Sequence, residues 1–309
     1  MKIVFMGTPD FAASALEALI QAGHEITLVV TQPDKPKGRS KELMPSPVKV
    51  CAMKYDLPVF QPVRIKRPEA IEQLKKYEAD IFVVAAFGQI LSQEILDMPK
   101  YGSVNIHASL LPKYRGASPI QSVIIDGEEK TGVTIMQMDA GIDTGDMLYK
   151  KEVVIEDTDN FETLHDKLAA VGAEAIVEAL PLLEAGKLVG EKQNDAESSH
   201  VTMITKEMGK LDFTKDAVVL DRLIRGMNPW PSAFTFYKGK QLKVWEAHVE
   251  DVPTAVACGE VAEVTKNEIK VATEKGLLCI TSLQLEGKKR MSTHDFLLGV
   301  KVAEGDKLG

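Results

Sequence analysis

Short apolar runs alternate with helical patterns through the first half of the chain. Residues 2–6 (KIVFM) and 26–30 (ITLVV) are typical of strands, and residues 81–86 (IFVVAA) are apolar throughout, as expected of a parallel strand covered on both faces. Between the first two strands, residues 11–22 have helical spacing and end at Gly23, a favoured residue after a helix. This alternation of strands and helices predicts a parallel α/β sheet.

The pattern changes towards the C-terminus. A long amphipathic helix is predicted over residues 160–186, and the polar stretch after it is typical of a linker. Short alternating runs separated by turn residues then predict a small β-barrel or sandwich. We therefore expect one domain over residues 1–188, a linker over 189–206 and a second domain over 207–309. The alternating runs are residues 234–237, 242–249, 259–264, 268–273 and 277–284.

The composition is that of a globular enzyme. Of 309 residues, 45% are hydrophobic and 27% are charged, and no apolar run approaches the roughly 18 residues that a membrane span needs. Cys51, Cys258 and Cys279 are scattered and form no CxxC pair, which argues against a disulfide framework and against a zinc site. We expect an intracellular protein that contacts no membrane.

The net charge of −8 does not by itself favour a nucleic-acid partner, but the charge is uneven. Within residues 34–49, four cations lie close to Gly38, and nearby prolines disfavour regular structure. Such a segment is either a solvated surface loop or a basic arm that reaches for phosphates. The four cations are Lys35, Lys37, Arg39 and Lys41.

Residues 103–108 (SVNIHA) place two polar side chains on one face of a predicted buried strand. Asn105 and His107 are two positions apart, and alternate residues of a strand point to the same side. Both lie near the carboxyl end of their strand, where open α/β sheets bind ligands. An isolated strand histidine is more often a hydrogen-bonded core residue, but the shared strand end and the following Ser109 favour a functional pair.

A loop rich in glycine and aspartate at residues 138–147 (MDAGIDTGDM) is the second candidate. Asp139, Asp143 and Asp146 are consistent with a turn, with a calcium loop, or with a carboxylate that orients the strand imidazole. The spacing departs from that of EF-hand loops, which place acidic or amide groups at alternate positions and close with Glu. The residues alone leave open which aspartate contacts the imidazole.

These residues together resemble the folate-dependent formyltransferases. NIHASLLP, residues 105–112, is similar to the signature of that family, and GIDTGD, residues 141–146, to its downstream aspartate motif. The similarity extends through GTPDF, LMPSPVK, NPWPSAF and the C-terminal β region, essentially the whole chain. The resemblance implies a Rossmann-like parallel-sheet domain followed by an OB-like β-barrel domain that binds tRNA.

The resemblance also implies the chemistry. It gives 10-formyltetrahydrofolate as the donor, the α-amine of methionyl initiator tRNA as the acceptor, and catalytic roles for Asn105, His107 and Asp143, with no metal. We expect a monomer in the cytoplasm. The other residues that the resemblance assigns are Ser109, Leu110, Leu111, Pro112, Gln89, Ile90 and Leu91 around the folate, and Lys35, Lys37, Arg39 and Lys41 in the basic loop that approaches tRNA.

Three other functions compete with this interpretation. One is formyl transfer to a sugar-nucleotide amine or to a glycinamide-type substrate. A second is a non-catalytic RNA-binding or nucleotide-binding protein of the same fold, which the intact Asn, His and Asp set disfavours. The third is a dehydrogenase, but MGTPDF, residues 6–11, lacks the two further glycines of a GxGxxG dinucleotide fingerprint.

Overall fold

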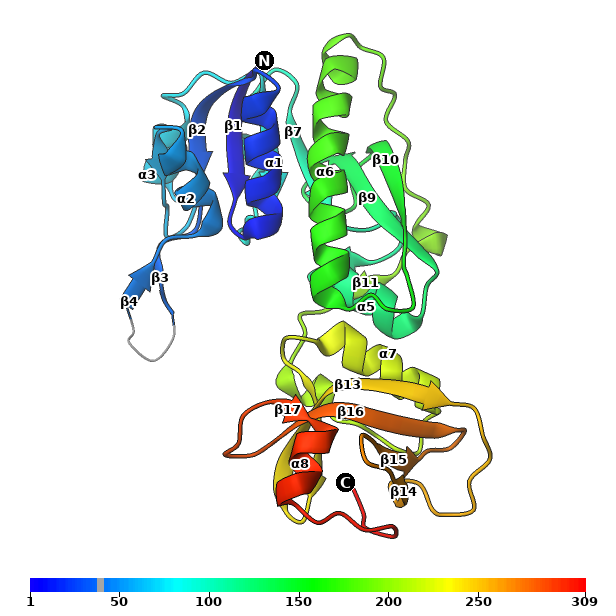
Figure 1. Cartoon of the computed structure of the whole chain (residues 1–309). Helices are drawn as coiled ribbons and strands as arrows, with labels where there is room; N and C mark the ends of the chain where they lie inside the picture. Colours follow the sequence, from blue (N-terminus) through cyan, green and yellow to red (C-terminus); the bar gives the residue numbers. More distant parts are fainter. Residues whose placement is uncertain (38–41) are drawn as a thin grey trace. The chain divides into compact units, whose positions relative to one another are not determined.

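The computed structural model describes residues 1–37 and 42–309, and the chain forms two compact units (Figure 1). No helix in these described ranges has the length and apolar character needed to cross a bilayer. The expected domain limits at residues 188 and 207 stay a prediction. The first unit consists of Met1–Pro119, Lys130–Val154 and His165–Val201, and the second of Ile120–Glu129, Ile155–Leu164 and Thr202–Gly309.

The first unit is built on a seven-stranded sheet in the order β10-β9-β7-β6-β1-β2-β5. The strands from β7 to β5 are parallel, whereas β9 is antiparallel to its neighbours β7 and β10. This largely parallel sheet confirms the predicted α/β fold. The strands are β1 (Lys2–Gly7), β2 (Glu25–Val30), β5 (Val59–Phe60), β6 (Ile81–Ala85), β7 (Ser103–His107), β9 (Lys130–Gln137) and β10 (Met147–Val154).

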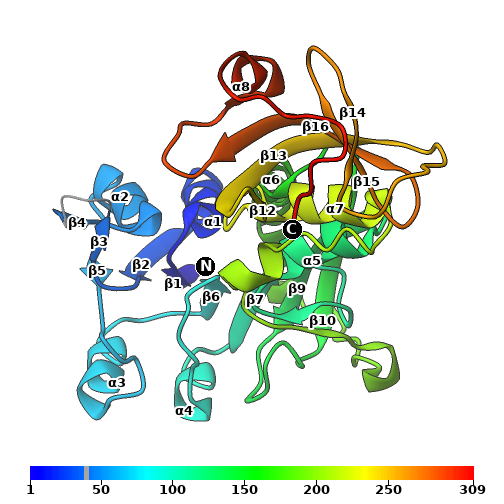
Figure 2. The same cartoon turned by 90° about the horizontal axis from the view of Figure 1, so that it is seen from below.

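Helices cover both faces of this sheet, which explains why its central strands are apolar on both sides. Val4 and Met6 of β1 share a buried cluster with residues of α3 and α4, and Figure 2 shows these helices across the strands from α1. On the other face, Gly172 of α6 lies so close to Ile106 and Phe11 that a Cβ there would be 3.1 Å and 3.5 Å from them. The helices are α1 (Asp10–Gln21), α2 (Pro47–Lys54), α3 (Pro68–Leu74), α4 (Gln93–Leu96) and α6 (Phe161–Glu184).

The second unit is an antiparallel β domain, as predicted. Its sheet has the order β12-β13-β16-β15-β14, with β17 paired to β16, and Figure 2 shows the long strands β13 and β16 side by side. The helix α7 packs against β13, and α8 packs against β16. The elements are α5 (Pro119–Asp126), η2 (Lys206–Gly209), α7 (Ala217–Met227), β12 (Ala233–Tyr237), β13 (Lys240–Glu250), β14 (Val261–Val264), β15 (Ile269–Ala272), β16 (Leu277–Leu285), β17 (Met291–Ser292) and α8 (Thr293–Gly299).

Asp306, near the end of the chain, connects the C-terminal residues to the β-sheet of the second unit. The carboxylate of Asp306 accepts hydrogen bonds from the Tyr237 hydroxyl (2.7 Å) and from the backbone N–H of Ala303 (3.1 Å), and Lys238 Nζ lies 3.3 Å away. The N–H of Ala303 first, and then Tyr237 and Lys238, hold the pKa of Asp306 below its usual value. The ionised carboxylate therefore ties the C-terminal residues to the end of β12.

The substitution Asp306→Asn tests this contact through its pH dependence. A carboxyl group whose pKa is lower in the folded state stabilises the fold above its unfolded pKa, near 3.9, and loses that contribution as the pH falls through the folded value. We expect the variant to melt at a lower temperature than the wild type at pH 7, and the difference to shrink below about pH 4. The same substitution at the exposed Asp157 is the control. A melting difference that is constant with pH would contradict this role.

Candidate active site

Asn105 and His107 lie on β7, with β6 on one side and β9 on the other. Asn105 pairs with Val84 of β6 and with Met136 of β9, so the strand is central in the sheet. The side chain of His107 is buried, with 6% of its surface exposed, and that of Asn105 is half-buried. Within the described part of the chain, the Asn105 carboxamide has no hydrogen-bond partner. Its two N–H groups are therefore available to a ligand.

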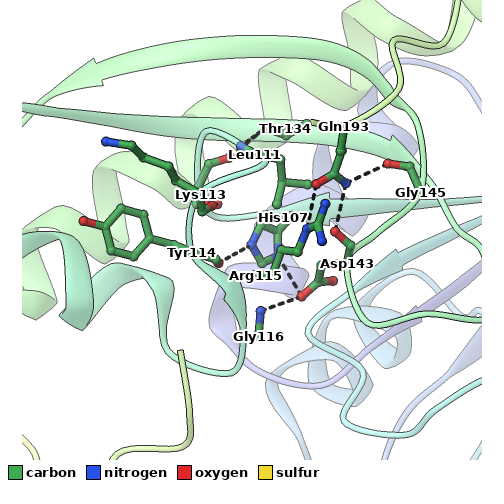
Figure 3. A network of polar contacts seen from close by, with 11 residues as sticks. His107, Leu111, Lys113, Tyr114, Arg115, Gly116, Thr134, Asp143, Gly145 and Gln193 are labelled. Carbon is green, nitrogen blue, oxygen red and sulfur yellow. Dashed lines mark hydrogen bonds and ion pairs between the residues drawn. The ribbon is translucent and has the colours of Figure 1, made fainter. Parts of the chain in front are cut away.

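The imidazole of His107 is held at both ring nitrogens (Figure 3). Its Nε2 lies 2.9 Å from the carbonyl oxygen of Tyr114, and its Nδ1 lies 3.6 Å from Oδ2 of Asp143. A carbonyl oxygen only accepts hydrogen bonds, so Nε2 carries a proton. The same Asp143 oxygen accepts the backbone N–H of Gly116 at 2.9 Å. The structure thus brings together the histidine and one of the three candidate aspartates.

The loop between β9 and β10 has to turn back along the sheet for Asp143 to reach the imidazole. It begins after Gln137, which pairs with Val104 at the opposite end of β7 from His107. Asp143 has a left-handed backbone with φ of 55°, and a Cβ at Gly145 would lie 1.8 Å from a backbone oxygen of β9. The glycines and the strained aspartate are therefore what the reversal requires.

Asp139, the first aspartate of this loop, has the contacts of a turn residue. Oδ1 of Asp139 accepts the N–H of Gly141 at 3.0 Å and the hydroxyl of Thr144 at 2.7 Å. These bonds are local, as is usual for an aspartate that stabilises a turn. Asp139 thus shapes the loop, whereas Asp143 faces the imidazole.

Two residues that were not among the predicted site residues support the loop that carries Asp143. Gln193 donates from Nε2 to the carbonyl oxygens of Asp143 (2.8 Å) and Gly145 (2.7 Å), and its Oε1 accepts from Nε of Arg115 (2.8 Å). Arg115 is buried, with 3% exposed, and its second contact is with Asp195 at 2.8 Å. Arg115 lies three positions after the NIHASLLP motif, whereas Gln193 lies in the expected linker and carries no recognisable pattern.

The loop after β7 is fixed to β9 by one threonine. The hydroxyl of Thr134 donates to the carbonyl oxygen of Ser109 (2.7 Å) and accepts the N–H of Leu111 (3.1 Å). Leu111 is buried in a small apolar cluster with Met136 and Met147, whereas Leu110 and Pro112 are half-buried. The predicted folate loop is therefore pinned by its backbone and exposes only part of its side chains.

The second predicted folate segment follows β6, whose carboxyl end lies beside that of β7. Gln89 holds a neighbouring loop, because its Oε1 accepts the N–H of Ile65 (2.7 Å) and its Nε2 donates to the carbonyl of Pro62 (2.9 Å). Leu91 is buried in the core, while Ile90 is 63% exposed. Of the three predicted residues, Ile90 is the one with a free apolar surface.

The predicted tRNA segment forms part of a hairpin. Strands β3 (Lys35–Lys37) and β4 (Glu42–Met44) pair antiparallel and project from the sheet in Figure 1. At the base of the hairpin, Asp34 accepts hydrogen bonds from Lys49 (2.7 Å) and Gln61 (2.7 Å). Lys35 is exposed. Two of the four predicted tRNA-binding cations, Arg39 and Lys41, lie outside the described residues.

One group of side chains in the second unit has the chemistry of metal ligands. His248, Glu250, Glu268 and Cys279 each offer one ligand atom, and these atoms lie within 4.8 Å of one another. Lys270 already balances part of this charge, since its Nζ lies 3.0 Å from Glu250. Burial, with the two carboxylates, raises the pKa of the Cys279 thiol to about 12. The sequence expectation of no metal stays a prediction.

Comparison with known proteins defines the class to which this fold and site belong. Residues 1–180 match the formyl transferase family, and residues 203–301 match the formyl transferase C-terminal domain. The chain therefore belongs to the formyl transferase family. Within it, the chain groups with the methionyl-tRNA formyltransferases: that of Agathobacter rectalis is 53% identical over 305 residues, which cover 99% of this chain and 98% of that protein.

Solved structures share the fold at lower identity. The N-formyltransferase from Helicobacter canadensis, in complex with folinic acid and dTDP-3-aminofucose, matches with a TM-score of 0.69 and 18% identity over 94% of this chain and 100% of that one. HypX from Aquifex aeolicus, in complex with tetrahydrofolic acid, matches with a TM-score of 0.66 and 18% identity over 98% of this chain. The chain spans 48% of the length of HypX.

Gly116 offers a test of how the Asp143 contact is held. It has φ of 113°, and a Cβ there would lie 2.3 Å from the carbonyl oxygen of Val201. We expect Gly116→Ala to lose formyl transfer and to destabilise the fold by about 1–3 kcal/mol, because the N–H that binds Asp143 is displaced. Gly186→Ala is the matched control, with φ of 65° and nothing within 4 Å of the added Cβ. Equal activity in the two variants would contradict the assignment.

Proposed function

We propose that this chain transfers the formyl group of 10-formyltetrahydrofolate to the α-amine of methionyl initiator tRNA. The observation that carries the proposal is the distance of 3.6 Å between Nδ1 of His107 and Oδ2 of Asp143. His107 lies on β7, the strand that also presents the Asn105 carboxamide. Full-length relatives named methionyl-tRNA formyltransferase support the acceptor. The folates bound in solved structures of the same fold support the donor.

Asn105 is the proposed donor to the developing negative charge. In the reaction the amine nitrogen bonds to the formyl carbon, and the bond from that carbon to the folate nitrogen breaks. Between these two steps, negative charge develops on the formyl oxygen. N–H donors that are already in position stabilise this charge without reorganisation. Asn105 meets this need because both of its N–H groups are without a partner in the described structure.

His107 and Asp143 supply charge and a proton route in this proposal. The Nε2 proton of His107 is donated to Tyr114, so the ring acts on the formyl oxygen through its positive charge when protonated, rather than through that N–H. The carboxylate of Asp143 lies 3.6 Å from Nδ1 of the same ring. The amine loses one proton and the leaving nitrogen gains one, and Asp143 relays it between them.

Only some of the predicted folate-binding residues are placed to contact the donor in this proposal. We propose that Ser109, Leu110, Leu111 and Pro112 border the donor through their loop, and that Ile90 provides an exposed apolar contact from the neighbouring strand end. In this proposal neither Gln89 nor Leu91 touches the pterin, since the Gln89 amide is occupied by backbone groups of the neighbouring loop and Leu91 is in the core.

The substitution Asn105→Ala tests the catalytic role. Removal of one oxyanion donor costs roughly a hundredfold or more in turnover, and we expect that loss in kcat with methionyl initiator tRNA and 10-formyltetrahydrofolate. Asn105→Asp keeps the shape but removes the donors, and we expect it to be equally impaired. Asn267→Ala, at an exposed position, is the control.

The same assay tests the acceptor. Donor consumption that requires charged initiator tRNA, and is weaker with elongator tRNA, supports the proposed substrate. Near-full activity of Asn105→Ala would refute the catalytic assignment, and formylation of a sugar-nucleotide amine instead of the tRNA would refute the acceptor.

The basic hairpin is the proposed tRNA contact. Lys35, Lys37, Arg39 and Lys41 would neutralise phosphates near the acceptor end, and each such contact adds to the salt dependence of binding. We expect Arg39→Ala to weaken tRNA-dependent activity and to reduce the slope of the log binding constant for tRNA against log salt, by about 0.9 for one lost phosphate contact. Lys76→Ala removes one exposed charge elsewhere and serves as control. An unchanged salt slope would leave this segment as a surface loop.

The wider organisation follows from the same proposal. We propose that residues 1–188 form the catalytic domain, that 189–206 connect it, and that 207–309 form an OB-like domain that contacts tRNA. We further propose that the protein acts as a monomer in the cytoplasm, where translation initiation consumes formylated initiator tRNA. Sedimentation of the full chain at assay concentration tests the monomeric state.

A further inference from the structure

The segment after α6, which we propose connects the two domains, also contacts the loops around the proposed catalytic groups. Residues 191–201 pair with β10 through two backbone hydrogen bonds between Glu191 and Met147, of 2.8 Å and 2.9 Å. They then form the short strand β11 (His200–Val201), which pairs parallel with β8 (Arg115–Gly116). This segment belongs to the first unit, together with β7 and the loop that carries Asp143.

Gln193 of this segment fixes the backbone at the Asp143 carboxylate. Its amide spends both N–H groups on the carbonyl oxygens of Asp143 and Gly145, at 2.8 Å and 2.7 Å, and its oxygen accepts from Nε of Arg115. Figure 3 shows these contacts beside the imidazole. Because a guanidinium only donates hydrogen bonds, the Gln193 amide must turn its oxygen towards Arg115, which leaves its two N–H groups aimed at the loop.

Ser199 of the same segment fixes the other neighbour of the imidazole. Its hydroxyl accepts the backbone N–H of Tyr114 at 2.8 Å, and its carbonyl accepts the N–H of Arg115 at 2.9 Å. The carbonyl of Tyr114 is the acceptor for His107 Nε2. The segment therefore holds the residue on each side of the ring: Tyr114 through Ser199, and Asp143 through Gln193.

Both of these neighbours have a conformation that needs support from outside. Tyr114 has φ of 60° and Asp143 has φ of 55°, values that residues other than glycine adopt only when surrounding contacts enforce them. The hydrogen bonds from Gln193 and Ser199 are made directly to these two backbones. Without them, each of these two backbones loses a hydrogen bond that supports its conformation beside the imidazole.

We propose that Gln193 and Ser199 are positioning residues for formyl transfer, acting through Asp143 and Tyr114 to set the orientation of the His107 ring. This role rests on the proposed function of the Asn105, His107 and Asp143 site. It predicts an effect on the chemical step with little effect on substrate binding, because neither side chain faces the substrates in the proposed arrangement. A displacement of about 1 Å in a catalytic group costs on the order of a hundredfold in rate.

Gln193→Glu is the sharpest test. The carboxylate has nearly the same shape and still accepts from Arg115, but it has no N–H for the two carbonyls of the Asp143 loop. We expect kcat to fall about 10- to 100-fold, with KM for 10-formyltetrahydrofolate and for methionyl-tRNA nearly unchanged. The nitrogen NMR resonances of the His107 ring should also shift. Gln93→Glu makes the same chemical change on the exposed surface of α4 and is the control.

Ser199 provides an independent pair of variants. Ser199→Ala removes the hydroxyl that accepts the Tyr114 N–H, and we expect a fall in kcat of the same kind. Ser199→Thr keeps a hydroxyl at this position, and we expect it to restore turnover. If Gln193→Glu fails to fold, the Ser199 pair decides, because the serine-to-alanine change leaves the backbone pairing of β8 and β11 in place.

The outcomes separate this role from the proposed function. If Asn105→Ala loses transfer while folded Gln193→Glu and Ser199→Ala keep full kcat and an unchanged His107 spectrum, the positioning role is overturned alone. A rise in KM with unchanged kcat overturns it as well. If Asn105→Ala keeps full activity, the proposed catalytic site itself is overturned.

Discussion

A buried imidazole needs a partner at each ring nitrogen, and the first unit is arranged around meeting that need at His107. Nε2 is satisfied by the carbonyl of Tyr114, and Nδ1 faces the carboxylate of Asp143. Neither partner is a neighbour on the strand, so one loop has to fold over the strand end and another has to return along the sheet. The cost of an unpaired buried polar group makes this arrangement obligatory.

The cost of that arrangement is visible in the backbone. Tyr114 and Asp143 both have positive φ, which costs of order 1–3 kcal/mol for each residue that is not glycine. Strain of this kind persists only where surrounding contacts over-determine the conformation, and here Arg115, Gln193 and Ser199 supply those contacts. The polar network around the imidazole thus keeps the strained backbones of Tyr114 and Asp143 beside the ring.

The sequence predicted the parts of this site that follow from local periodicity. Alternation along β7 placed Asn105 and His107 on one face, and the apolar strand pattern gave the largely parallel sheet that carries them. It did not choose among the three aspartates, because the path of the Gly-rich loop depends on contacts with a segment about fifty residues away, such as Gln193. An isolated glutamine in a polar stretch has no periodic or motif signal, so only the folded chain reveals its bonds.

In the second unit, too, the hydrophobic pattern of the sequence predicted the strands but not the contacts between residues far apart in the chain. Its short alternating runs predicted a small β-barrel or sandwich, and the structure has an antiparallel β-sheet over these residues. Pattern did not predict that Asp306, close to the C-terminus, would be fixed to Tyr237, because that contact joins residues far apart in the chain. Cross-strand pairing likewise brought His248 beside Cys279 and left the latter thiol buried.

The pairing of β11 with β8 has a consequence for where the catalytic part of the molecule stops. The family match for the first domain ends at residue 180, whereas the compact unit runs on to Val201. A protease that cut between α6 and Gln193 would leave Asn105, His107 and Asp143 in one fragment but separate them from residues 193–201. A cut after Val201 would leave those residues attached. The first compact unit therefore extends beyond α6, through residues that hydrogen-bond to the backbones of Tyr114 and Asp143.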